Sequence, residues 1–134
     1  MQVCSILETC LYVDDLDSAE EFYTRVLGLE VFKKVAGRHV FFRCGDQMFL
    51  LFNPDQTQQE ENGFPTHGAR GEGHVAFAIS ADTYEAWKQR LQEEDVEIEY
   101  EAIWPSGGKS MFFRDPAGNS AELATKQTWL LEET

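Results

Sequence analysis

The order of apolar and polar positions predicts a strand and then a helix near the start of the chain. Residues 6–13 (ILETCLYV) are a strand candidate whose alternate positions form two faces. Residues 17–27 place apolar side chains three and four positions apart, which is typical of a helix with one buried face. The stretch DDLDS supplies N-cap candidates, Ser18 and Glu21 have the spacing of a capping box, and Gly28 suits the helix end. Three further strands are expected at residues 29–35, 39–43 and 47–52.

The same pattern returns in the second half of the chain. Residues 53–73 are polar and rich in Gly and Pro, and they are interpreted as a linker. A strand is then expected at residues 74–80 and a helix at residues 83–94, with Asp82 or Ser80 as its N-cap. The remaining strands are expected at residues 96–104, 109–114 and 120–124. The sequence FFR stands before a hairpin turn in both halves, which supports an internal duplication.

The duplicated pattern predicts an α+β fold made of two βαβββ modules. The chain has 134 residues, which is enough for one domain with a hydrophobic core. The expected divisions are module 1 at about 4–53, the linker at about 54–72, module 2 at about 73–126 and a C-terminal tail at 127–134.

A histidine stands on an otherwise small-residue strand face at the start of module 2. In GHVAFAIS, the bulky side chains occupy one face, while His74 shares the other face with Ala76 and Ala78. Superposing the first strands of the two modules puts Glu8 opposite His74. The same repeat-related position therefore carries an ionisable side chain twice.

Glu122 is a third isolated charged residue among small side chains. It follows the turn sequence DPAGN and shares a strand face with Ser120 and Ala124. A buried carboxylate needs a partner, because desolvating an unpaired charge is costly. A histidine beside two carboxylates is a plausible ligand set for a divalent cation. The alternatives are a hydrogen-bonded structural role for His74, an edge-strand charge for Glu8 and a solvated strand position for Glu122.

Three stretches together resemble a known superfamily. ETCLYVDDLDSAEEFYTRVLGLE, GHVAFAI and FFRDPAGNSAEL are similar to the vicinal oxygen chelate group, which includes glyoxalases, bleomycin resistance proteins and dioxygenases. The resemblance implies that the paired modules form a cupped, incomplete β-barrel. It also implies one divalent metal ion per chain (Fe, Mn, Zn, Ni or Mg), held by Glu8, His74 and Glu122.

The ligand pattern departs from the subgroups of this superfamily. Many members have a histidine where this chain has Glu8, and residues 49–51 contain no counterpart of the fourth ligand of glyoxalase I. The resemblance implies a metal-dependent lyase or isomerase, less so a ring-cleaving dioxygenase, with Glu8 or Glu122 as the catalytic base. The alternative is a non-catalytic protein of the bleomycin-resistance type that sequesters an antibiotic. His39 and His67 are interpreted as surface or loop residues.

Five further residues are candidates for substrate binding. Arg43 and Arg114 are related by the repeat and could neutralise a substrate anion, although pairing of Arg114 with an acidic neighbour is the alternative. Trp104 and Lys109 flank a Gly-rich loop that could close over substrate. Tyr12 is expected to line the cavity, and core packing is the other explanation for this ring.

The composition of the chain excludes several classes of binding partner. A formal net charge of −13 argues against nucleic acid and anionic membranes, which select basic surfaces. Apolar residues make up 43% of the chain and aromatic residues 13%, which excludes a disordered protein. The cysteines are odd in number, so a disulfide framework is not expected. No run approaches the roughly 18 apolar residues of a membrane span. The N-terminal stretch MQVCSILE does not resemble a signal peptide. We therefore expect a cytoplasmic protein, a small-molecule substrate and, from the resemblance, a homodimer.

Overall fold

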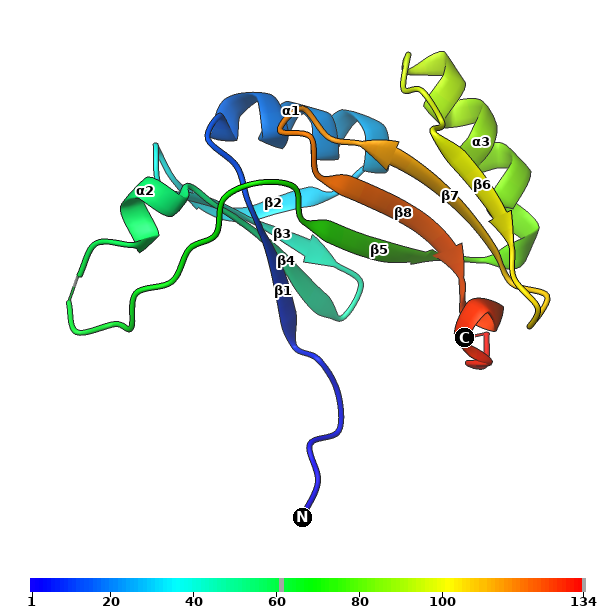
Figure 1. Ribbon diagram of the computed structural model, residues 1–134, viewed down its shortest axis with the longest axis horizontal. Coiled ribbons are helices and arrows are strands. Elements are labelled where there is room, and N and C mark those ends of the chain that lie inside the picture. Colours follow the sequence, from blue (N-terminus) through cyan, green and yellow to red (C-terminus); the bar gives the residue numbers. More distant parts are fainter. Residues whose placement is uncertain (61, 134) are drawn as a thin grey trace. The chain divides into compact units, whose positions relative to one another are not determined.

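The computed structural model describes residues 1–60 and 62–133, which form two compact units, Met1–Gly71 and Glu72–Thr134 (Figure 1). Each unit contains a four-stranded mixed sheet, and in each the first strand is followed by a helix and then by three strands. The predicted α+β fold of two βαβββ modules is therefore confirmed.

The first unit is built on one sheet with strand order β1-β4-β3-β2. Strand β1 runs parallel to β4, and the other neighbouring pairs are antiparallel. Its elements are β1 (Glu8–Tyr12), α1 (Leu16–Leu27), β2 (Glu30–Val35), β3 (His39–Cys44), β4 (Gln47–Phe52) and the short helix α2 (Pro54–Thr57).

Helix α1 is fixed at both ends by local chemistry. The Asp15 side chain accepts a hydrogen bond from the Ser18 backbone N–H at 3.1 Å, and Gly28 ends the helix at φ 69°. The predicted capping box between Ser18 and Glu21 is wrong. Asp15 already satisfies the Ser18 N–H, and Glu21 instead binds Arg25 one turn later at 2.6 Å.

The segment predicted to be a linker packs with the first unit. Asn53 caps α2 by accepting a hydrogen bond from the Asp55 N–H at 2.9 Å, and Pro54 occupies the first turn, where a missing N–H costs nothing. The chain then turns back, and the His67 N–H donates to the Thr57 carbonyl at 3.1 Å. The side chain of His67 is hydrogen-bonded to Tyr12 of β1, so this segment lies against the sheet.

The second unit repeats the arrangement with strand order β5-β8-β7-β6, in which β5 runs parallel to β8. Neither Ser80 nor Asp82 caps the second helix by its side chain, because a 3₁₀ turn precedes that helix. In the described part of the chain, no helix has the length and apolar character needed to cross a bilayer. The elements are β5 (His74–Ile79), η1 (Ala81–Thr83), α3 (Tyr84–Glu93), β6 (Tyr100–Ile103), β7 (Lys109–Arg114), β8 (Ser120–Thr125) and η2 (Lys126–Trp129).

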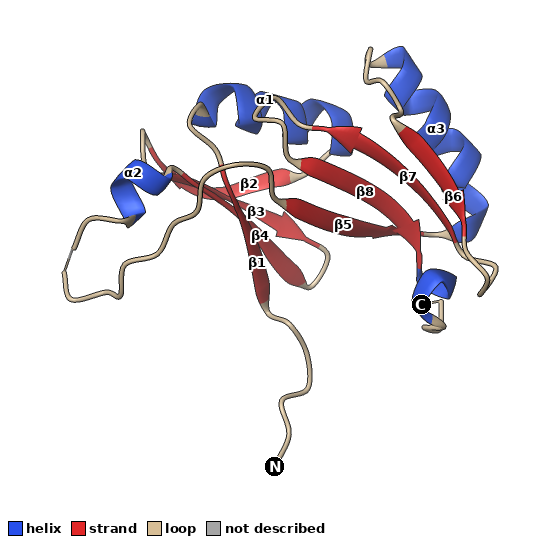
Figure 2. Ribbon diagram, in the orientation of Figure 1, coloured by secondary structure: helices blue, strands red, loops and turns tan. Residues whose placement is uncertain are grey.

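Each sheet has a helix-covered face and an open face (Figure 2). In the second unit, Val75, Phe77 and Ile79 are buried on the helix side, whereas His74 and the alanines of β5 are exposed. The alternation predicted for this strand is therefore confirmed. We call the sheet surface that carries His74 the open face of the second unit, and the surface that carries Glu8 the open face of the first.

Candidate metal and substrate site

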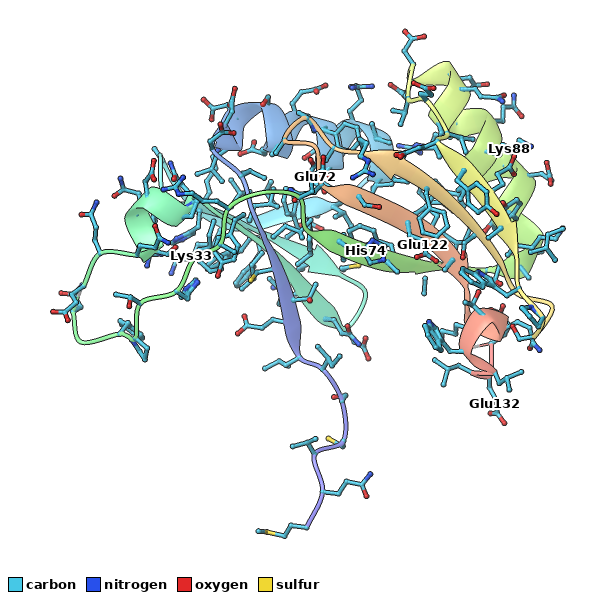
Figure 3. The ribbon with its side chains drawn as sticks, viewed as in Figure 1. Lys33, Glu72, His74, Lys88, Glu122 and Glu132 are labelled. Atoms are coloured by element: carbon cyan, nitrogen blue, oxygen red, sulfur yellow. The ribbon has the colours of Figure 1, made fainter. Side chains whose placement is uncertain are left out.

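The second unit brings two of the predicted metal ligands together. The parallel register pairs His74 with Ser120 and Ala76 with Glu122, so the two side chains lie diagonally on the open face. The Nε2 atom of His74 is 3.4 Å from Oε1 of Glu122, and Figure 3 shows the two side chains next to each other. The imidazole is half-exposed, and the carboxylate is only 10% exposed. The pair therefore has an accessible imidazole and a largely buried carboxylate on the open face.

A backbone hydrogen bond determines which nitrogen of His74 carries a proton. Nδ1 of His74 is 3.0 Å from the carbonyl oxygen of Ser120, and a carbonyl can only accept. Nδ1 is therefore protonated, and Nε2 is the nitrogen directed at Glu122. In the neutral ring, the Nε2 lone pair faces a carboxylate oxygen, and two such atoms need a cation between them.

The distance between these two atoms suits shared coordination. Metal bonds of 2.0–2.1 Å in a tetrahedral arrangement separate neighbouring ligand atoms by about 3.3 Å. The 3.4 Å between His74 Nε2 and Glu122 Oε1 is close to this value. An imidazolium–carboxylate ion pair is the other arrangement with the same geometry. One nitrogen and one carboxylate oxygen are ligands that Zn, Fe, Mn and Ni accept, so the residues present fit a divalent cation.

Glu122 is held by a chain of hydrogen bonds that the sequence analysis missed. Its Oε2 accepts from the Ser110 hydroxyl at 2.6 Å, and the Ser110 oxygen accepts from the Trp104 indole N–H at 2.8 Å. Ser110 is fully buried. Because Oε2 is occupied, Oε1 is the oxygen presented to His74. The alternation of β7 places Ser110 on the same face as Phe112, and this was the signal that could have identified it.

Aromatic rings flank the pair. The Phe112 ring is nearly parallel to that of His74, with centroids 6.3 Å apart, and the Tyr100 ring is 6.2 Å from Phe112. Ala76 and Ala78 present no bulk on the same face. The open face therefore offers an apolar, flat surface beside a polar pair, which is the usual composition of a small-molecule site.

Glu8, the third predicted ligand, belongs to the first unit. It is exposed and shares the open face of that unit with Cys10 and Tyr12. Within the described residues, no group of three or more His, Cys, Asp or Glu side chains is arranged to hold a metal ion. The structure thus brings His74 and Glu122 together, and the participation of Glu8 stays a prediction.

The open face of the first unit is hollowed by a cavity of about 800 Å³. Glu8 lines it, together with Phe52 and His67. The hydroxyl of Tyr12 lies 2.6 Å from Nδ1 of His67, and this contact holds the segment around His67 against β1. Burial, and secondarily the neighbouring Cys10 thiol, raises the pKa of Tyr12 above its usual value, so the phenol stays protonated.

His39 also lines this cavity, and its predicted surface position is wrong. The ring is only 8% exposed, because it stacks on Phe41 with centroids 4.1 Å apart. A guanidinium nitrogen of Arg38 donates to Nδ1 of His39 at 2.7 Å, since an arginine cannot accept. His39 is therefore a neutral imidazole packed into an aromatic wall.

The two repeat-related arginines have different surroundings. Arg114 binds both carboxylate oxygens of Glu99, at 2.8 and 3.2 Å, and also approaches Glu72 at 3.4 Å. The structure therefore supports the alternative in which Arg114 pairs with acidic neighbours, and the guanidinium lowers the pKa of Glu99. The guanidinium carbon of Arg43 lies 4.3 Å from the centroid of the Phe32 ring, a cation–π contact.

The remaining candidates, Trp104 and Lys109, lie at different places. Trp104 is part of the hydrogen-bond chain to Glu122 through Ser110. Lys109 precedes Ser110 on β7 and so faces the helix side, where its ammonium is 5.4 Å from the centroid of the Tyr84 ring. Lys109 therefore lies outside the open face of the second unit.

Comparison with known proteins agrees with this fold. Residues 5–123 match the family model of the Glyoxalase/Bleomycin resistance protein/Dioxygenase superfamily, and the chain belongs to this superfamily. A solved structure described as lactoylglutathione lyase from Agrobacterium tumefaciens is 42% identical in sequence to this protein. The match covers 98% of this chain and 100% of that chain, with a TM-score of 0.94.

Two further proteins are also similar. The metallothiol transferase FosB of Staphylococcus epidermidis (strain ATCC 12228 / FDA PCI 1200) is 28% identical over 93% of this chain and 84% of its own length. The fosfomycin resistance protein FosX from Listeria monocytogenes has a TM-score of 0.68 at 19% identity, covering 95% of this chain and 99% of its own. The latter likeness shows the fold alone.

Proposed function

We propose that this protein is a divalent-metal-dependent enzyme that acts on a small substrate with two neighbouring oxygens, in a lyase- or isomerase-type reaction. The observation that carries the proposal is the pair His74–Glu122, with the imidazole tautomer set by the Ser120 carbonyl. The 42% identity to the structure described as lactoylglutathione lyase supports the lyase type. Ring-cleaving dioxygenase chemistry is the less favoured variant.

The proposed metal ligands are Glu8, His74 and Glu122. Glu8 comes from the same chain or from a second copy of it. A bound Fe, Mn, Zn, Ni or Mg ion would act as a Lewis acid that polarises a substrate oxygen. Ser110 keeps the Glu122 carboxylate in one orientation, since it donates to Oε2 at 2.6 Å. The apolar rings beside His74 orient the rest of the substrate and exclude water.

We assign the role of general base to Glu8 rather than to Glu122. Glu122 is buried, and one of its oxygens is already bound to Ser110, so its movement would break a short hydrogen bond. Glu8 is exposed, and it lines the cavity of the first unit. A carboxylate at such a position can take a proton from a substrate C–H bond and return it to a neighbouring atom.

The test compares Glu8→Gln with Glu30→Gln, a matched change at an exposed strand position outside the proposed site. The metal-reconstituted proteins are assayed with lactoylglutathione and with the 2-oxoaldehyde and thiol that form it, among other substrates with neighbouring oxygens. Loss of turnover with metal retained in Glu8→Gln supports the proposal. Unchanged turnover in this variant contradicts the assigned role.

A non-catalytic binding protein of the bleomycin-resistance type is the second candidate. The observation that favours it is the cavity of about 800 Å³ in the first unit, which is large enough for a drug-sized ligand. Ligand binding without turnover, unchanged by chelation of the metal, would favour this candidate. The similarity to metallothiol transferase FosB adds thiol transfer to the reactions worth assaying.

We further propose that the protein is a cytoplasmic homodimer. Light scattering on the purified protein measures the mass of the particle, and a mass of one chain would contradict the dimer.

A further inference from the structure

The cavity of the first unit presents positive charge in a strongly acidic chain. The formal net charge is −13, yet Lys33 and Arg38 both line the cavity. Among the described lining residues, Glu8 is the one carboxylate. Cationic side chains therefore outnumber carboxylates among these described lining residues, although the whole chain is strongly acidic, and a ligand attracted by the local side chains differs from one attracted by the overall charge.

Two neighbouring lysines of β2 lie on opposite faces of the first sheet. Lys33 is paired with Phe41 in the sheet register and so shares the open face with it. Lys34 is paired with the buried Val40, and its ammonium binds the carboxylate of Glu20 at 2.9 and 3.3 Å. Within the described residues, Lys33 has no ion-pair partner. Its charge is available to a bound molecule, whereas the charge of Lys34 is paired with Glu20.

The walls of the cavity are flat and apolar. His39, neutral because Nδ1 accepts from Arg38, stacks on Phe41 with an angle of 9° between the ring planes. The Phe52 ring meets Phe41 edge-on at 5.5 Å and His67 at 4.8 Å. These rings form a surface on which a planar molecule can stack.

We propose that this cavity binds an amphipathic organic anion, with a flat aromatic body against Phe41 and Phe52 and a carboxylate group near Lys33 and Arg38. The charge of these side chains argues against the aromatic cation that the net charge of −13 by itself would suggest. The proposal goes beyond the metal-dependent activity, because binding of this anion requires no bound metal, although Glu8, a proposed metal ligand, lines the same cavity.

The test uses three probes of nearly the same shape and different charge: 2-naphthoate, 2-naphthamide and 2-naphthamidine. Each is titrated into the full chain after removal of metal by a chelator, and binding is measured by calorimetry. We expect 2-naphthoate to bind most tightly and 2-naphthamidine least tightly. In Lys33→Gln, the affinity for 2-naphthoate falls about fivefold, the range expected for one exposed ion pair, and that for 2-naphthamide is unchanged.

Lys34→Gln is the matched control, because it removes the same charge one residue away on the opposite sheet face. It leaves the affinity for all three probes unchanged. Phe41→Leu, which keeps an apolar side chain of similar volume, weakens all three probes. Equal losses in the two lysine variants, tighter binding of 2-naphthamidine, or no binding of 2-naphthoate overturns the proposal. Because metal and turnover play no part, these outcomes are independent of the proposed enzyme function.

Discussion

The Nδ1–H of His74 donates to the backbone carbonyl of Ser120 at 3.0 Å, and this hydrogen bond points Nε2 at Glu122. The donor and acceptor are brought together by the parallel pairing of β5 with β8, which places the two residues opposite each other. The fold itself therefore selects the tautomer that a metal ligand needs. No side chain at position 120 is involved.

Ser110→Ala is expected to weaken metal binding by about 10- to 100-fold, the usual effect of losing a hydrogen-bond partner of a metal ligand. The variant removes the donor to Glu122 Oε2 and the acceptor of the Trp104 indole. Competition with a chelating dye measures the affinity. Because Trp104 loses its partner, the tryptophan emission of the metal-free variant should also differ from that of the wild type.

Ser120→Ala is the matched control for that substitution. It removes a serine hydroxyl on the neighbouring strand and retains the carbonyl that His74 uses. We expect wild-type metal affinity in this variant. If Ser110→Ala and Ser120→Ala bind metal equally well, the hydrogen-bond chain has no role in holding Glu122 for metal.

Tyr12→Phe is expected to release the segment around His67, which follows α2, from the first sheet. The variant loses the 2.6 Å hydrogen bond to His67, while the ring and its packing against Phe52 are retained. Hydrogen–deuterium exchange of residues 62–70 should become faster, with little change in β3 and β4. Unaltered exchange in that segment would show that Tyr12 does not hold it in place.

Tyr84→Phe is expected to destabilise the second unit by about 1 kcal/mol at neutral pH, because the hydroxyl donates to the Ser110 carbonyl and to Glu101. Burial and the Glu101 carboxylate raise the pKa of Tyr84 above the ordinary value of 10.0. The unfolded chain therefore loses this proton at lower pH than the folded chain, and the stabilisation is lost as pH rises above about 10.

Urea unfolding followed by tryptophan fluorescence measures this effect, since Trp87, Trp104 and Trp129 all belong to the second unit. The difference in free energy of unfolding between wild type and Tyr84→Phe should stay constant up to about pH 9 and shrink as the pH rises above about 10. A constant difference would mean that the buried hydroxyl does not titrate as described. Tyr100→Phe, on the open face, should have little effect on stability near neutral pH.

Much of the fold was predictable because local and long-range signals agree. The repeat of strand, helix and strands, the glycine after α1 and the alternation in β5 all follow from periodicity and backbone chemistry. The same alternation placed His74 and Glu122 each among small side chains on its own strand. Their separation of 3.4 Å depends on the parallel register, which only the structure supplies.

The errors and omissions have physical causes. Ser110 resembles any strand serine until the register places it beside Glu122. His39 was assigned to the surface because nothing local shows that its ring will pack edge-on against Phe52 of the neighbouring strand. The segment after β4 was interpreted as a linker from its polar composition, although its contact with Tyr12 joins residues far apart in sequence. In each case, a long-range contact overrides the local signal.

The measurement that tests the central claim most directly is metal content by mass spectrometry after chelation and reconstitution, on the wild type and on His74→Ala. His39→Ala serves as the control histidine, since its ring packs in the aromatic wall of the other unit. The account predicts about one divalent ion per chain in the wild type and in His39→Ala, and almost none in His74→Ala. Equal metal content in the wild type and His74→Ala, or no metal in the wild type, would contradict it.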